Sequence, residues 1–389
     1  MKSGDGLKGV IIIEGHVQGL ANTRALGRAG IPVIVISQHN CLAHYSKYCK
    51  KFYKCPGYLT GEFIDFLIHL ANKEGIIGWV LLPSNDHAVY NISKNIEILQ
   101  PYFKIISPEP GILKTIYDKE LLIKLCQNIE VPVPQSWFPV TQDEINPSVL
   151  KYPLLLKGKN GLTFYKTMGK KAFLVDKPQN LPGFLEAIIE KAQFSNTYLQ
   201  NLLPIENNKP ISFTAFSENG EIKSYWMGVK IREHPLHFGT ATFSRSIHIP
   251  SLLPLAERLL RKLSYTGVCE IEFLLDPRDN EYKLIEINAR TWLWVNLAIK
   301  SGINYPVMIY NYLNNIETVY PQSYEAGKEW MHYVTDIPFS LLGIFRGNYS
   351  PKEIIRSYLK FPGPAVFDFS DILPSFAEIV LLPFLFLKR

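Results

Sequence analysis

Two acidic segments in the second half of the chain contain residue types that bind divalent cations and phosphate. They read Glu270-Ile-Glu272-Phe and Glu286-Ile-Asn288-Ala-Arg290. Alternate residues of a strand share a face, so Glu286, Asn288 and Arg290 point one way, and Glu272 can lie opposite them on a neighbouring strand. Carboxylate and amide oxygens are the ligands that Mg²⁺ prefers. We therefore predict a metal site at Glu272, Glu286 and Asn288, which could hold two ions around a phosphoryl group.

The residues around this predicted metal site have supporting or alternative interpretations. Arg290 would be a fixed cation for a transferred phosphate or a substrate carboxylate. Glu270 falls on the same face as Glu272, and we place it outside the ligand set as a supporting carboxylate. The alternative to a metal site is an amphipathic hairpin whose polar face is simply solvated.

Two lysines that precede the acidic segments are candidates for phosphate binding. Lys157 ends an apolar run and is followed by Gly158-Lys-Asn-Gly161, a short loop that resembles a phosphate cradle. Lysine offers phosphate a point charge on a flexible stem. Lys119 lies earlier in the chain, and simple solvation is a stronger alternative for Lys119 than for Lys157.

Two further segments have features of a nucleotide site. Lys230 and Arg232 are two residues apart, so a regular strand would place both cations on one face, although such cations are more often on the surface. The segment Gln200-Asn201-Leu-Leu203 runs into a proline. A segment stiffened in this way can present backbone amide and carbonyl groups to an adenine edge.

The elements that position these residues begin with an α/β unit. The apolar runs Val10–Ile13 and Val33–Ile36 are separated by a helix-like segment, which predicts buried parallel strands. The glycines between the runs do not form GxGxxG, so the dinucleotide-binding fingerprint is absent. Residues 1–113 are therefore expected to form a small open α/β domain.

The remainder of the chain has a different pattern. The strand that ends at Lys157 is expected to pair with Ala172–Val175 across a turn that contains Gly169. Asn219-Gly220 predicts a hairpin. Residues beyond about 318 are rich in aromatics and weakly periodic, and we expect them to form an extension that wraps around the body.

Composition limits the function classes. The 389 residues are 47% hydrophobic and can bury a core spread over two or three domains. The net charge of +6 fits anionic substrates such as nucleotide phosphates. The densest basic cluster is expected to be a solvated face and not a nucleic-acid site; it consists of Lys47, Lys50, Lys51 and Lys54.

Several features predict a cytoplasmic protein. The five cysteines form no CxxC pair, which favours a reducing compartment. The N-terminal apolar run is short and reads as a strand, not as a signal peptide. The C-terminal run Ile379–Leu387 is too short to span a membrane and contains Pro383. We expect this run to pack on the body, with peripheral membrane contact as the less favoured alternative.

The order of these motifs resembles the ATP-grasp superfamily, in particular the carboxylate–amine ligase branch that includes D-aspartate ligase-like enzymes. The resemblance covers most of the chain and rests most specifically on Glu286-Ile-Asn288-Ala-Arg290, which matches the E-x-N-x-R motif of the family. It implies an N-terminal parallel α/β domain, a two-lobed ATP-grasp fold and a C-terminal extension. The corresponding ranges are 1–113, 114–196 (small lobe), 197–317 (large lobe) and 318–389.

The resemblance also implies a role for each site residue. Lys119 and Lys157 would hold the phosphates of ATP, and the backbone from Gln200 through Asn201 to Leu203 would meet adenine. Two Mg²⁺ ions, with Mn²⁺ as an alternative, would be bound by Glu272, Glu286 and Asn288. The γ-phosphate and an acyl phosphate would be stabilised by Lys230, Arg232 and Arg290.

Two departures from the family pattern are visible. The multi-glycine loop after the strand lysine is reduced to Gly158-Lys-Asn-Gly161, and the proline common in this motif is Ala289. The implied reaction joins a small carboxylate to an amine, such as an amino acid or a peptide-like compound. The alternatives are a carboxylase of the same fold that uses bicarbonate, and a non-catalytic ATP sensor or scaffold. The sequence motifs make no prediction of the oligomeric state.

Overall fold

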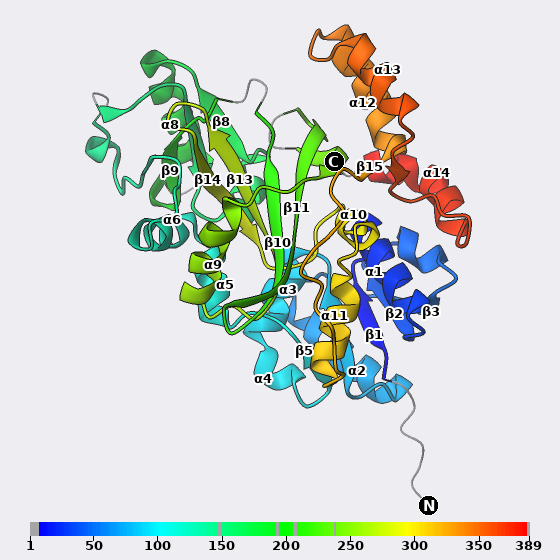
Figure 1. Cartoon of the computed structure of the whole chain (residues 1–389). Coiled ribbons are helices and arrows are strands. Elements are labelled where there is room, and N and C mark those ends of the chain that lie inside the picture. The colour runs from blue at the N-terminus through cyan, green and yellow to red at the C-terminus, as the bar shows by residue number, and fades with distance from the viewer. Residues whose placement is uncertain (1–7, 147–148, 192–193, 205–207, 237–238, 387–389) are drawn as a thin grey trace, which may run out of the picture.

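The computed structural model describes residues 8–146, 149–191, 194–204, 208–236 and 239–386, which form three β-sheets with flanking helices (Figure 1). The N-terminal sheet is entirely parallel, in the order β3-β2-β1-β4-β5. Its strands are β1 (Val10–Ile13), β2 (Val33–Ser37), β3 (Cys49–Lys54), β4 (Trp79–Pro83) and β5 (Phe103–Ile105). Its helices are α1 (Val17–Arg28), α2 (Gly61–Glu74), α3 (Asp86–Lys94) and α4 (Ile96–Leu99).

The apolar run of β1 is continuous because both faces of the strand are covered. Val10 and Ile12 pack in one cluster with residues of α1, whereas Ile11 and Ile13 pack in another with residues of α2. All four side chains are fully buried, as expected for a central parallel strand. The predicted open parallel α/β arrangement is confirmed.

A four-stranded antiparallel sheet follows, in the order β6-β9-β7-β8. It is reached through α5 (Pro110–Tyr117) and α6 (Lys119–Asn128). Its elements are β6 (Ser136–Trp137), β7 (Leu154–Gly158), α7 (Gly161–Met168), β8 (Ala172–Val175), α8 (Leu181–Lys191) and β9 (Thr197–Asn201). The predicted pairing of β7 with β8 is correct and Gly169 has the positive φ of a turn, but the helix α7, which lies between β7 and this turn, was not predicted. Phe164 of this helix is buried against the sheet, which explains why the segment folds back as a helix.

The largest sheet has seven strands, in the order β14-β13-β10-β11-β12-β15-β16. These are β10 (Ile211–Glu218), β11 (Glu221–His234), β12 (Thr240–Ser246), β13 (Gly267–Asp276), β14 (Glu281–Asn288), β15 (Glu329–Met331) and β16 (Gly363–Pro364). The predicted hairpin joins β10 to β11, and Asn219 and Gly220 both have positive φ, as a tight turn of this kind requires. The helix α9 (Leu252–Lys262) packs on β10 and β11.

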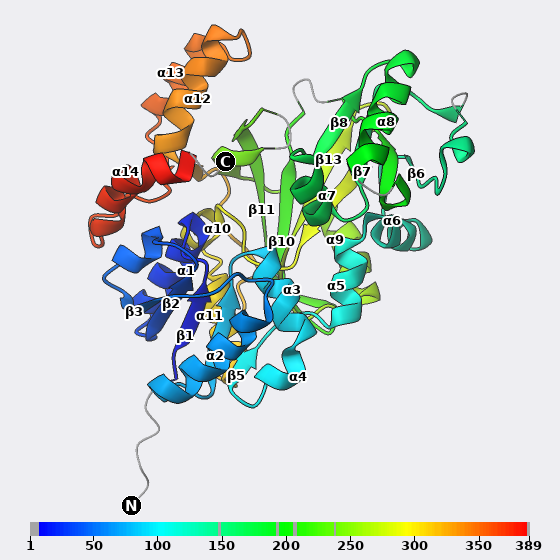
Figure 2. The ribbon, with the colours of Figure 1, turned by 180° about the vertical axis from the view of Figure 1, so that it is seen from behind.

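The last part of the chain returns to the N-terminal domain twice, first through two consecutive helices and again through its last helix. The helices α10 (Val295–Lys300) and α11 (Tyr305–Leu313) pack against α1. Two further helices, α12 (Tyr333–Phe345) and α13 (Pro351–Leu359), project from the body on one side (Figure 1 and Figure 2), whereas α14 (Leu373–Phe386) packs on the short 3-10 helix Leu42–Tyr45 of the N-terminal domain. In the part of the chain that the structure describes, no helix has the length and apolar character needed to cross a membrane.

Candidate functional site

A cavity of about 480 Å³ lies between the four-stranded and the seven-stranded sheet, with Gln18 and Asp86 of the N-terminal domain at its border. It brings together residues from distant parts of the chain, from Gln18 to Trp294. Every predicted site residue except Arg232 lines this cavity: Lys119, Lys157, Gln200, Asn201, Leu203, Lys230, Glu272, Glu286, Asn288 and Arg290.

The acidic residues of the cavity lie on the antiparallel pair β13 and β14. Glu272 is directly opposite Glu286, and Glu270 is directly opposite Asn288. Asn288 Nδ2 donates to Glu270 Oε2 at 3.0 Å, and Ser212 Oγ donates to the other oxygen of Glu270 at 2.7 Å. The amide nitrogen of Asn288 is therefore held by Glu270, which leaves its amide oxygen as the atom available to a cation.

Each of the two opposed carboxylates also faces a lysine. Lys230 Nζ lies 2.9 Å from both oxygens of Glu272, and Lys119 Nζ lies 3.4 Å from Glu286 Oε1. Among the described residues, no three His, Cys, Asp or Glu side chains are grouped closely enough to form a metal site by themselves. A cation site here would therefore have to include the amide oxygen of Asn288 beside the carboxylates.

The environment of the cavity shifts the pKa values of two of its carboxyl groups in opposite directions. Burial alone would raise the pKa of Glu286, but Lys119, Lys171 and Lys157 outweigh it and lower the pKa to about 2. Burial, reinforced by the adjacent Glu272, raises the pKa of Glu270 to about 7. Glu286 is thus ionised at any physiological pH, as a metal-binding carboxylate must be.

The two predicted phosphate-binding lysines are brought together by contacts between their loops. The residue before Lys119, Asp118, forms a β-bridge with Asn160, and the Lys119 amide donates to the Lys159 carbonyl at 2.9 Å. Lys157 Nζ donates to Gln200 Oε1 at 3.1 Å. The short loop after Lys157 therefore holds the start of α6 in place beside the strand.

The segment predicted to meet adenine is fixed by hydrogen bonds of its own. The amide of Asn201 donates to the Gln135 carbonyl at 2.9 Å, and the amide of Leu202 donates to the Pro153 carbonyl at 3.1 Å. Both groups are thereby used within the protein. Of the backbone donors in this segment, the Leu203 amide has no protein partner within the described part of the chain, and it is the donor that remains for a ligand.

Arg290 is held from the N-terminal domain, a contact that sequence reasoning missed. Its Nε and Nη2 lie 2.9 and 2.8 Å from the two oxygens of Asp86, the first residue of α3, and its Nη1 donates to the Thr291 carbonyl at 3.0 Å. Tyr117 Oη lies 3.5 Å from the same carboxylate. A signal was present, because polar residues at the carboxyl end of a parallel strand, here β4, commonly contribute to sites.

The structure corrects the prediction for Arg232, which does not reach the cavity. The pairing of β11 with β12 shifts register on both sides of Arg232, so the strict alternation that would align it with Lys230 is broken. Glu233 lines the cavity instead. Arg232 is buried on the other side of the strand, where its guanidinium lies 3.0 and 2.6 Å from the two oxygens of Asp336. Its role is to attach α12 to the sheet.

Two tryptophans that follow Arg290 combine packing with a place in the cavity wall. Trp292 and Trp294 are almost fully buried, and both pack against Trp226. They also border the cavity. Their position at the wall means that this aromatic cluster helps to define the shape of the site.

Comparison with known proteins supports an ATP-grasp assignment. Residues 249–304 match the family model described as the carbamoyl-phosphate synthase L chain, ATP-binding domain. The D-aspartate ligase of Enterococcus faecium is 22% identical over 256 residues, which cover 62% of this chain and 61% of the relative. A mitochondrial arginine-specific carbamoyl phosphate synthase large chain of Schizosaccharomyces pombe is 22% identical over 87% of this chain, but the match covers only 28% of that protein.

Solved structures show the same fold at low sequence identity. Biotin carboxylase from Campylobacter jejuni aligns with a TM-score of 0.66 and 16% identity, covering 83% of this chain and 74% of that chain. The L-amino acid ligase from Bacillus licheniformis aligns with a TM-score of 0.61 and 15% identity, covering 81% and 77%. The ATP-grasp resemblance predicted from the sequence is confirmed. Because ligases and carboxylases both appear, the fold alone does not select between their reactions.

Proposed function

We propose that this chain, which has the ATP-grasp fold, is an ATP-dependent ligase that joins a carboxylate to an amine through an acyl phosphate and releases ADP and phosphate. The observation that carries the proposal is the set of opposite charges in one cavity. Lys119, Lys157 and Lys230 line it together with Glu272 and Glu286. Phosphoryl transfer depends on positioning and on charge neutralisation, for which both kinds of group are needed.

The residues of the cavity divide between the two steps of the proposed reaction. First, a carboxylate oxygen of the substrate attacks the γ-phosphorus and the bond to ADP breaks, while Lys119 and Lys157 hold the departing phosphates. Lys230 and Arg290 face the transferred group. Then the amine attacks the acyl carbon, the carbon–oxygen bond to phosphate breaks, and the amine loses a proton.

The donor set fits magnesium. We propose that the carboxylates of Glu272 and Glu286 and the amide oxygen of Asn288 would hold it, with Glu270 fixing the orientation of Asn288. Bound magnesium would neutralise phosphate charge during the transfer. We also propose that the site holds two ions. Mn²⁺ can replace Mg²⁺ in this proposal, because both metals bind oxygen ligands.

The proposed reaction can be tested by product analysis with pools of amino acids and short peptides. We expect ADP and phosphate to form only when both a carboxylate and an amine are present, because the amine completes the turnover. Formation of AMP and pyrophosphate would contradict the acyl phosphate. ADP release with bicarbonate and no other acid would favour a carboxylase, and tight ATP binding without turnover across the pools would favour a sensor.

Affinity for ATP should depend on pH through Lys157. Burial, reinforced by the neighbouring Lys119, lowers the pKa of Lys157 to about 8. Below this pH the lysine is charged and attracts phosphate, and as the pH rises through it the charge is lost. We therefore expect the Kd for ATP, measured by calorimetry, to increase by up to about tenfold between pH 7 and pH 9.

The matched control for this pH effect is Lys157→Arg, whose guanidinium stays protonated over the whole range. Its Kd for ATP should change little between pH 7 and pH 9. An equally steep increase in the arginine variant would assign the pH dependence to another group.

A further inference from the structure

The C-terminal helices α12, α13 and α14, which we call the C-terminal arm, expose apolar side chains to an unusual degree. On α12 the exposed residues Ile337, Leu341 and Phe345 are four positions apart and form one stripe, and 88% of Phe345 is exposed. Exposed apolar residues also occur on α13, on α14 and in the segment between them: Ile355, Leu359, Phe361, Phe367, Phe369, Ile372, Leu373, Phe376, Ile379 and Val380. Apolar side chains exposed in such number over consecutive elements are typical of a surface that contacts a protein or a membrane.

The inner side of the arm is polar and firmly attached to the body. Asp336 of α12 accepts hydrogen bonds from Arg232 at 3.0 and 2.6 Å and from Tyr358 at 2.7 Å. Asp371, just before α14, lies 2.8 Å from Arg24 of α1. The arm therefore reverses the usual polarity of a surface helix, because its ionic contacts face the protein and its apolar side chains face outward.

A second inner contact fixes α14. His332 Nε2 lies 2.5 Å from Glu378 Oε1, and both side chains are buried. Glu378 is thereby turned inward while Phe376 and Ile379 beside it are exposed. The outward direction of the apolar residues is thus set by buried hydrogen bonds of the folded protein.

The exposed charges of the arm are predominantly positive. Arg346, Lys352 and Arg356 are exposed and, within the part of the chain that the structure describes, have no ion-pair partner. Of the acidic residues of the arm and its connections, Asp336, Asp371 and Glu378 are buried and Asp368 is paired with Arg28, whereas Glu353 is exposed. The outer surface therefore combines aromatic and aliphatic groups with basic ones.

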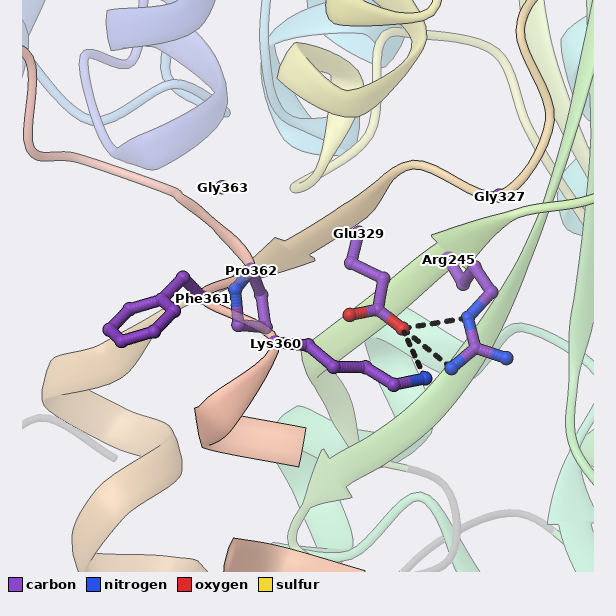
Figure 3. Close-up of a pocket in the computed structure, with 7 residues that line it drawn as sticks. All are labelled: Arg245, Gly327, Glu329, Lys360, Phe361, Pro362 and Gly363. Carbon is purple, nitrogen blue, oxygen red and sulfur yellow. Dashed lines mark hydrogen bonds and ion pairs between the residues drawn. The ribbon is translucent and has the colours of Figure 1, made fainter. Parts of the chain in front are cut away.

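A cavity at the base of the arm adds to this positive charge (Figure 3). Arg245 Nε lies 2.9 Å from Glu329 Oε1, and Lys360 Nζ approaches the same oxygen at 3.9 Å, so two cations share one carboxylate. Phe361 points away from this ion cluster, and 82% of its surface is exposed. The cavity thus carries an excess positive charge beside an exposed ring.

We propose that the C-terminal arm binds the surface of an anionic phospholipid membrane, with its apolar side chains at the acyl boundary and its basic side chains at the phosphates. Basic and apolar residues combined on an outer helical face are the recognised composition of such interfacial segments. The charge also argues against a second copy of the chain as the occupant, because the exposed charges of the arm are mostly basic and a second arm would offer them few complementary acidic groups. The inference does not depend on the proposed reaction.

The proposal can be tested with the full-length protein and two kinds of vesicle, one of phosphatidylcholine mixed with phosphatidylglycerol and one of phosphatidylcholine alone. We expect co-sedimentation with the anionic vesicles and much weaker binding to the neutral ones. Phe345→Ser combined with Phe369→Ser should reduce the vesicle-bound fraction by at least about tenfold, because both rings are almost fully exposed. Lys352→Glu combined with Arg356→Glu should weaken binding to the anionic vesicles.

The matched control is Val319→Ser, which removes an apolar side chain that is 90% exposed and lies outside the arm. It should bind vesicles as the unchanged protein does, and the circular dichroism of all variants should match, because only exposed side chains are altered. Absence of binding by the unchanged protein would overturn the proposal. So would a dimer in sedimentation velocity that the double phenylalanine variant converts to a monomer, since this outcome would assign the surface to a second copy.

Discussion

Replacing Glu286 with glutamine should reduce the turnover number on the order of 10²–10³-fold or more while the protein remains folded. Lys119, Lys171 and Lys157 keep this carboxylate ionised, and it lies opposite Glu272 in the cavity. Glutamine keeps the size of the side chain but removes the negative charge that would hold a divalent cation. Steady-state turnover at saturating substrates, together with the melting temperature, measures both parts of the prediction.

Glu281→Gln provides the matched control for Glu286. Glu281 is the first residue of β14, and it forms an ion pair with Lys283 away from the cavity. Glu281→Gln should therefore leave the turnover number almost unchanged. Full activity of the Glu286 variant, or equal losses in the two variants, would remove Glu286 from the proposed metal site.

Replacing Asp336 with alanine should lower the free energy of unfolding by about 3–5 kcal/mol. Asp336 is fully buried and accepts hydrogen bonds from Arg232, Thr242 and Tyr358. Its removal leaves the buried guanidinium of Arg232 without its carboxylate, and an uncompensated buried charge is costly. Urea denaturation of the variant and of the unchanged protein measures the difference.

An exposed ion pair serves as the comparison for Asp336. Glu325 lies 2.8 Å from Lys328 at the surface, so Glu325→Ala should change the free energy of unfolding by less than about 1 kcal/mol. A similarly small effect of Asp336→Ala would show that Arg232 does not depend on this carboxylate. The assignment of Arg232 to the attachment of α12, and not to the cavity, would then be contradicted.

The parts of the fold that could be predicted from the sequence are those with regular periodicity. The run Val10–Ile13 predicted a buried parallel strand because every one of its residues is apolar. The alternation of Glu286, Asn288 and Arg290 predicted that these residues share a face, and all three line the cavity because β14 pairs regularly with β13 from Glu286 to Asn288. The sequence pattern was sufficient to place these residues because each one has the environment that its pattern predicts, in the core of a sheet or facing the cavity.

The wrong or missing predictions concern positions where the folded structure departs from the regular pattern of the sequence. The alternation rule failed at Arg232, because the irregular register of β11 against β12 turns its side chain toward α12. The helix α7 was missed because its segment has no strong helical pattern, and Phe164 is held by packing in the folded domain. The pairing of Arg290 with Asp86 joins residues 204 positions apart, so no window of the sequence contains it.

The central claim concerns the acyl phosphate, and transfer of oxygen from the substrate tests it directly. A carboxylate substrate identified by the ADP-release screen would be labelled with ¹⁸O in both oxygens and converted with unlabelled ATP and amine. If one carboxylate oxygen attacks the γ-phosphorus, each amide formed leaves one ¹⁸O atom in inorganic phosphate. Mass spectrometry of the products should therefore show singly labelled phosphate and unlabelled ADP. Unlabelled phosphate, or label in AMP, would contradict the proposed reaction.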